Sequence, residues 1–125
     1  MLKKSVVTLV AATVLSTAAV IPATAHHSTG AFYTDERVDV EGKVVEFLYV
    51  NPHGQLVIQD AAGAFWVGEM SSVLGLQRAG LTKAKLPVGT NIKINAQKSR
   101  DGSNRVFVRL IQKDGADVYK NEPEA

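Results

Sequence analysis

The 125-residue chain contains no cysteine. Without a thiol it can form no disulfide, thiolate nucleophile, thiolate-ligated zinc site or iron–sulfur cluster. Proline and glycine, at 4 and 10 residues, are too few for a collagen-like or linker chain. The hydrophobic content of 46% and charged content of 21% indicate a globular protein instead. The length allows one domain.

Motifs of several enzyme classes are also missing. The sequence has no phosphate-binding loop and no dinucleotide fingerprint. Its serines, such as Ser28 and Ser71, lack the context of a nucleophile elbow. Glu46 and Glu69 are strand acids without an evident partner, which weakens the case for a paired-carboxylate hydrolase. These absences favour a binding protein over an enzyme, although an oxidative activity stays open.

Residues 1–25 have the pattern of a secretory signal peptide. Lys3 and Lys4 precede an apolar stretch over 5–21, and a small-residue cleavage sequence ends at Ala25. Cleavage there predicts a periplasmic or secreted protein with no stable membrane insertion. The alternative is an uncleaved anchor, for which the apolar stretch is shorter than the roughly 20 residues of a membrane span.

Cleavage would also remove the excess positive charge. The full chain has 14 basic and 12 acidic residues, a net charge of +2, and the signal peptide holds two lysines and no acid. The mature chain therefore has 12 residues of each sign (14 − 2 = 12) and no net charge. A neutral exported protein is a poor nucleic-acid binder, so we expect no nucleic-acid partner.

Hydrophobic alternation predicts five β-strands and one helix. A slip in the alternation beside Gly42 indicates a bulge or bend in a long first strand. Ser71 or Ser72 starts a short helix that ends at Gly80. We expect Trp66 and the neighbouring strand aromatics in the core or half-buried, with an aromatic binding face as the alternative. The strands are expected at 38–50, 55–59, 64–70, 91–97 and 106–112.

This order of elements is that of the OB-fold. We therefore predict an all-β protein, a small five-stranded OB-like Greek-key barrel with one short helix between strands three and four. An SH3-like barrel is the alternative, and the helix after strand three argues against it. The predicted organisation is a signal peptide (1–25), an N-terminal lead-in segment (26–37), the barrel domain (38–116) and a polar C-terminal tail that frays (117–125).

Histidine is confined to three positions, His26, His27 and His53. Cleavage after Ala25 would give His26 an α-amine with a pKa of about 8, so its amine and imidazole could chelate one metal ion. His53, or His27 as the substitute, would complete a histidine brace, whose three planar nitrogen donors suit Cu(II). Weak axial ligands could come from Tyr33, Asp35, Glu36 or Met70.

The chain length permits two arrangements of this predicted copper site. The lead-in segment can fold back along the first strand to meet His53, or His26 and His53 can meet between two molecules. The oligomeric state stays open.

Other readings of the histidines stay open. His26 and His27 can be a solvated tail, and His53 can be a polar residue of an Asn-Pro-His-Gly turn. The protein is then either an interaction module that presents the loop at His53 and the hairpin at Asp101 to a periplasmic protein or small ligand, or a plain envelope domain. The expected partner is accordingly a metal ion or a periplasmic protein.

Several of these motifs resemble a family of exported bacterial proteins that is classed as a domain of unknown function. They are His26-His27-Ser28 after Ala25, Gly42-Lys43-Val44, Asn51-Pro52-His53, Leu74…Arg78-Ala79-Gly80 and Arg100-Asp101-Gly102-Ser103-Asn104. The resemblance covers nearly the whole mature chain and implies that the three histidines occupy motif positions of the family. It supplies no activity. Leu81 stands where members usually place a tryptophan.

Overall fold

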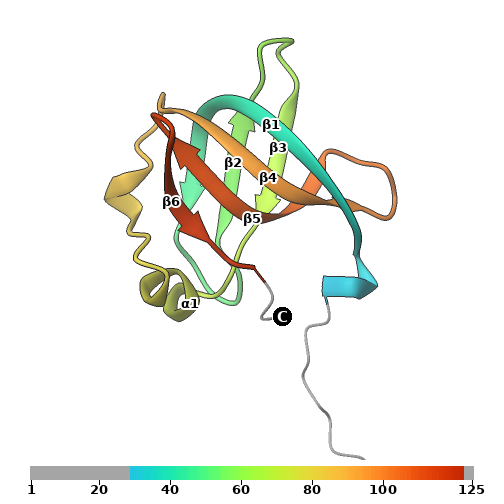
Figure 1. The fold of residues 1–125 in the computed structure, drawn as a ribbon, viewed down its shortest axis with the longest axis horizontal. Helices are drawn as coiled ribbons and strands as arrows, with labels where there is room; N and C mark the ends of the chain where they lie inside the picture. Colours follow the sequence, from blue (N-terminus) through green and yellow to red (C-terminus); the bar gives the residue numbers. More distant parts are fainter. Residues whose placement is uncertain (1–28, 123–125) are drawn as a thin grey trace, which may run out of the picture.

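The computed structural model of the chain describes residues 29–122, which form six β-strands in one sheet with one short α-helix (Figure 1). The predicted signal peptide (1–25), His26 and His27 lie outside the described residues. The predicted all-β class and the position of the helix between the third and fourth strands are confirmed. The elements are η1 (Thr29–Ala31), β1 (Tyr33–Leu48), β2 (Gln55–Gln59), β3 (Phe65–Glu69), α1 (Val73–Arg78), η2 (Lys83–Lys85), β4 (Asn91–Ser99), β5 (Arg105–Lys113) and β6 (Ala116–Lys120).

The long first strand is shared between two partners. Its first part pairs with β4 and its second part with β2, and the register shifts between Val44 and Glu46. The predicted bulge is thus confirmed. However, β1 begins at Tyr33, five residues before the expected strand start at 38. The reason is that β4 continues to Ser99, which pairs with Tyr33 and supplies backbone partners to this polar stretch.

Gly42 marks the point where β1 passes from β4 to β2. It pairs with Ile92 on β4, and a Cβ at this position would collide with the backbone carbonyl of Gln59. The neighbouring atom is backbone and cannot rotate away. Glycine is therefore required at this position, where the backbones of β1 and β2 approach each other closely.

The β2–β3 hairpin is organised by the carboxylate of Asp60. Oδ1 accepts hydrogen bonds from the amides of Ala62 and Ala64, and Oδ2 accepts one from Nε1 of Trp66 at 3.0 Å. These bonds, that of Trp66 first, hold the pKa of Asp60 below its ordinary value. The predicted turn over residues 60–63 is confirmed, and its acid fixes the strand register on both sides.

β3 has strand neighbours on both sides. It pairs with β2 in antiparallel register and with β5 in parallel register, where Gly68 lies opposite Val106. The strand order in the sheet is β3-β2-β1-β4-β5-β6, with β3–β5 as an additional pairing. The strand is therefore anchored to two elements that lie far apart in the sequence.

The sixth strand corrects the prediction of a five-stranded fold with a frayed tail. Asp114 and Gly115 both have positive φ, 52° and 76°, as a two-residue hairpin turn requires. The chain then returns along β5, with Tyr119 paired to Ile111 and only 2% exposed. The sequence did not predict β6 because its residues are mostly polar, and the strand forms through its hydrogen bonds to β5.

The hydrophobic core is continuous from the strands to α1 and the segment that follows it. Ser72 caps α1 as predicted, its hydroxyl accepting from the amide of Gly75. Leu76 on α1 and Leu81 after it are fully buried. Among residues 29–122, no helix has the length and apolar character needed to cross a membrane. The core is formed by Val40, Val44, Phe47, Leu56, Ile58, Met70, Leu76, Leu81, Leu86, Ile92, Ile94, Ala96, Val106, Val108, Ile111 and Tyr119.

Candidate functional site

His53 lies in the loop between β1 and β2 and is held against the end of β3. The loop is fixed by backbone bonds from the amide of Gly54 to the carbonyl of Ser71 and from the amide of Met70 to the carbonyl of Gly54. Nδ1 of His53 lies 3.1 Å from the carbonyl oxygen of Met70. Since a carbonyl only accepts, Nδ1 carries a proton, and in the neutral form of the ring the lone pair is on Nε2.

Glu69, the last residue of β3, lies beside this ring. Its Oε1 is 3.7 Å from Nε2 of His53, and both side chains are about one quarter exposed, at 23% and 27%. The sequence singled out Glu69 only as an acid without a partner. The structure gives it two, because its second oxygen contacts Tyr33.

Tyr33, the first residue of β1, donates its phenolic hydrogen to Oε2 of Glu69 at 2.5 Å. The residue is 4% exposed, and its ring packs on the ring of Phe107, with the ring centroids 5.6 Å apart. Burial, followed by the hydrogen bond and negative charge of Glu69, raises the pKa of Tyr33 to about 12 against the opposing effect of Arg105. The phenol is therefore neutral and a hydrogen-bond donor at physiological pH.

The ring of Phe107, on which Tyr33 packs, is itself held by Arg109. The guanidinium of Arg109 lies over the ring of Phe107, 4.6 Å from its centroid. Its Nε donates to Oε1 of Gln97, and a terminal nitrogen donates to the carbonyl of Asn121. Tyr33 thus rests on a stack of polar and aromatic groups that is tied to the end of β6.

A recess of about 490 Å³ opens in front of Tyr33 and Glu69. Its walls include Phe32, Arg100 and Arg105. Two hydrogen bonds hold the segment around η1 at this recess. Nε of Arg100 donates to the carbonyl of Gly30, and the backbone amide of Arg100 donates to the carbonyl of Phe32. The N-terminal end of the described chain therefore lies at the rim of the recess that contains Glu69.

The hairpin between β4 and β5 borders the same recess through Asp101. Hydrogen bonds from the hydroxyls of Ser103 and Ser99 lower the pKa of Asp101 to about 2, so this acid is a structural part of the turn. The predicted hairpin is confirmed here, with φ of +74° at Gly102. Glu69 connects the two predicted loops, since it contacts His53 and lines the recess beside Asp101.

The remaining candidate ligands lie elsewhere or are already engaged. Glu36 pairs with Lys98 at 2.9 Å, and the side chain of Met70 is fully buried in the core. Within residues 29–122, no three His, Cys, Asp or Glu side chains are grouped closely enough to hold a metal ion. His26 and His27, the other predicted ligands, fall outside this range.

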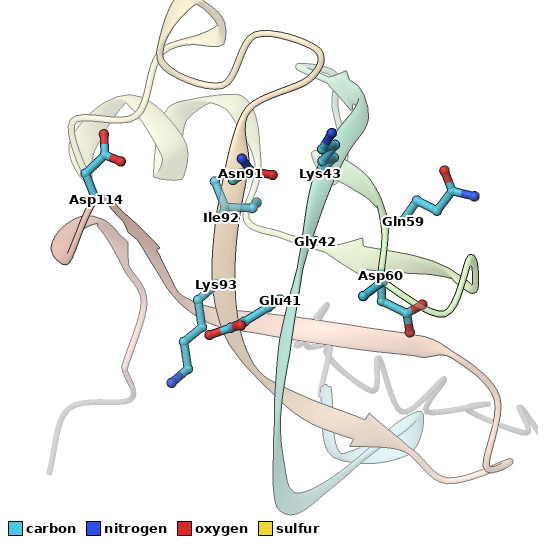
Figure 2. Close-up of a pocket in the computed structure, with 10 residues that line it drawn as sticks. Glu41, Gly42, Lys43, Gln59, Asp60, Asn91, Ile92, Lys93 and Asp114 are labelled. Carbon is cyan, nitrogen blue, oxygen red and sulfur yellow. The ribbon is translucent and has the colours of Figure 1, made fainter.

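A larger recess of about 610 Å³ lies at the other end of β2 (Figure 2). Its charged residues have mixed sign, with Lys43 and Lys93 beside the acids Glu41, Asp60 and Asp114. Figure 2 shows Asp60 and Asp114 on opposite sides of it. It contains none of the predicted ligands, and both carboxylate oxygens of Asp60 already accept hydrogen bonds.

Comparison with known proteins assigns the chain to a family. The model of DUF6152, described as a family of unknown function, matches residues 13–107. The chain belongs to this family. No curated protein matches the chain significantly. Because the DUF6152 description carries no activity, the function of this member has to be argued from its site.

One signal in the sequence could have located Glu69. The predicted turn over 60–63 sets the hairpin register, and counting outward from it places Glu69 opposite Gln55. Gln55 is two residues from His53. The burial of Tyr33 and its bond to Glu69 had no such signal, because they depend on how β1 curves toward β3.

Proposed function

We propose that this DUF6152 protein is exported, loses residues 1–25 and binds a transition metal ion, preferably copper, through its new N-terminus and His53. His26 would contribute its α-amine and imidazole, and His53 a third nitrogen, with His27 as the substitute. Three nitrogen donors of this kind suit Cu(II). Storage, delivery or sensing of the ion fits such a site.

One observation carries the proposal, the contact between Nδ1 of His53 and the Met70 carbonyl. Metal-binding histidines commonly donate one ring N–H to a carbonyl or carboxylate, which fixes the tautomer and aims the other nitrogen at the ion. Here that other nitrogen, Nε2, lies on the side of Glu69. The ring is oriented before any metal arrives.

The position of the N-terminal segment supports a site within one molecule. His26 is three residues from Thr29, which is at most about 11 Å of extended chain. Ala31 and Phe32 line the same recess as Glu69, whose carboxylate neighbours His53. The short reach from the rim favours this arrangement over a site shared between two molecules.

We also infer that the sheet closes as an OB-like barrel. The pairings of β3 with both β2 and β5 give β1, β2, β3, β5 and β4 two neighbours each, with β6 added along β5. OB-folds bind ligands with the loops between strands 1 and 2 and between strands 4 and 5. Those loops carry His53 and Asp101 in this chain, and Glu69 lies between them.

The decisive experiment begins with the exported protein. Intact mass should show a chain that starts at His26, and titration with Cu²⁺ should give a nitrogen-rich type 2 EPR signal. His26→Ala should abolish this signal, and His53→Ala should weaken binding by at least about tenfold. A mature chain acetylated at the α-amine of His26 is the control, because it keeps every side chain and removes the chelating amine. A dissociation constant weaker than micromolar that His53→Ala leaves unchanged would overturn the proposal.

The recess at Arg100 and Arg105 favours a second candidate function, a module that binds a periplasmic protein or small ligand without metal. Both arginines line a space of about 490 Å³ that also includes Phe32, whose side chain is exposed. Capture of a partner by the metal-free protein, lost in Arg105→Ala and retained in His26→Ala, would favour this function over metal binding.

A further inference from the structure

We propose that Glu69 is an oxygen ligand of the metal site and that Tyr33 is the residue that positions it. The inference rests on the proposed function and deepens it, since it changes the site from three nitrogen donors to a mixed nitrogen and oxygen set. Oε1 of Glu69 and Nε2 of His53 would both bind the ion.

The separation of these two atoms fits an ion between them. At 3.7 Å, Nε2 and Oε1 are farther apart than the donor and acceptor of an ordinary N–H···O bond, which are about 2.7–3.2 Å apart. Metal bonds to histidine nitrogen and carboxylate oxygen are about 2.0–2.2 Å long, so an ion touching both atoms as they stand would subtend an angle of about 125°. Adjacent ligands of tetragonal Cu(II) subtend about 90°, so the two atoms would have to approach each other by roughly 0.7 Å.

Tyr33 fixes the other half of the carboxylate. Its hydroxyl holds Oε2 at 2.5 Å, and its ring is packed on Phe107, so Glu69 cannot turn toward solvent without breaking a half-buried hydrogen bond. A carboxylate held at one oxygen presents the other in a constant direction. This is the way outer groups orient metal-binding carboxylates.

The end of β3 orients both proposed ligands. Glu69 contributes its side chain, and the next residue, Met70, contributes the carbonyl that accepts from Nδ1 of His53. Glu69 also pairs with Gln55 on β2 and with Phe107 on β5. The relative placement of the two ligands is therefore set by the sheet hydrogen bonds of β3 together with the backbone bonds that hold the loop at His53 against its end.

A carboxylate in the site should influence which ion is held. Carboxylate oxygen is a harder ligand than imidazole and does not favour Cu(I), which prefers soft sulfur donors. The site should hold Cu(II) more tightly than Cu(I), and it should also accept Zn²⁺, for which histidine and carboxylate are common ligands.

The test uses the mature chain that begins at His26, with Cu²⁺ titrated against a competing chelator and followed by EPR. Glu69→Gln keeps the shape of the side chain and removes its charge. It should weaken Cu²⁺ binding by at least about tenfold and shift the EPR parameters toward a purely nitrogen set. Glu41→Gln is the matched control, because it removes the same charge at the recess beyond the far end of β2 and should leave binding and spectrum unchanged.

Tyr33→Phe tests positioning separately from stability. It keeps the buried ring, so the metal-free protein should stay folded and lose only the stability of one hydrogen bond. The EPR signal should broaden into a mixture of species. Glu69→Asp, which retains the charge on a shorter side chain, gives the answer should Glu69→Gln fail to fold, and an intermediate affinity is expected.

The outcomes separate the two proposals. If the wild-type chain binds Cu²⁺ and His53→Ala loses it, but Glu69→Gln matches the wild type in affinity and spectrum, the role of Glu69 is overturned and the proposed function stands. If the wild-type chain binds no Cu²⁺, both are overturned. If Glu69→Gln weakens Cu²⁺ binding and His53→Ala does not, the claim that both residues bind the same ion is overturned.

Discussion

Tyr33 and Glu69 are 36 residues apart in the sequence and joined by a hydrogen bond of 2.5 Å between the phenol and Oε2. The bond connects the first residue of β1 to the last residue of β3. It brings the N-terminal end of the described chain to the strand end that orients His53. The candidate site therefore depends on a contact between elements that are not paired as strands.

Gly68 is predicted to be sensitive to the smallest side chain. A Cβ there would lie 2.5 Å from Cγ2 of Val108, so Gly68→Ala should destabilise the fold by about 1–3 kcal/mol through overpacking. The contacted atom is a side-chain methyl, so Val108→Ala should partly rescue it, with a coupling of about 1 kcal/mol or more. Gly42→Ala, which meets a backbone carbonyl, is the contrasting variant that Val108→Ala should not rescue. Urea unfolding followed by the single tryptophan, Trp66, measures all of these.

Asp60 should contribute to the loss of folding stability at acidic pH. Its pKa is lowered in the folded protein by Trp66 and the turn amides, so its contribution is fully present above the pKa of the unfolded chain, about 4. That contribution is lost as the pH falls through the folded-state value. Asp60→Asn should be less stable at pH 7 and should show a flatter decline between pH 5 and pH 3. Asp35→Asn, at an exposed strand position, is the control, and equal profiles for the two variants would contradict the prediction.

Tyr119 tests whether β6 is part of the fold. Tyr119→Ala should cost about 3–5 kcal/mol, as expected for a large aromatic side chain removed from a core. Tyr119→Phe removes only the bond between its hydroxyl and Ser71 Oγ and should cost about 1 kcal/mol. A frayed tail would give no change for either variant in thermal or urea unfolding.

Arg109 is predicted not to tolerate lysine. The planar guanidinium bonds to Gln97 and to the Asn121 carbonyl while lying over Phe107, and a lysine ammonium cannot reproduce this fork. Arg109→Lys should cost about 1–3 kcal/mol because buried acceptors are left unsatisfied. Arg78→Lys, on the exposed end of α1, should be neutral in the same unfolding assay.

Local patterns in the sequence predicted most of the elements. The apolar run Leu56-Val57-Ile58 between two glutamines placed β2, and Ser72 marked the start of α1, because these signals are set within a few residues. β6 escaped because its pairing depends on β5 and the turn at Asp114. In the same way, His53 stood out by type, whereas its contact with Glu69 follows from the register of a hairpin.

The double pairing of β3 has a consequence for the lifetime of the site. A strand bonded on both edges exposes its amides only when β2 and β5 separate from it, which requires an opening close to global unfolding. Amide hydrogens in β3 should therefore be among the last to exchange with deuterated solvent, and those of η1 among the first. Ligand entry and release would then proceed through fluctuations at the η1 side of the recess, while the carboxylate of Glu69 stays in place as long as the domain remains folded.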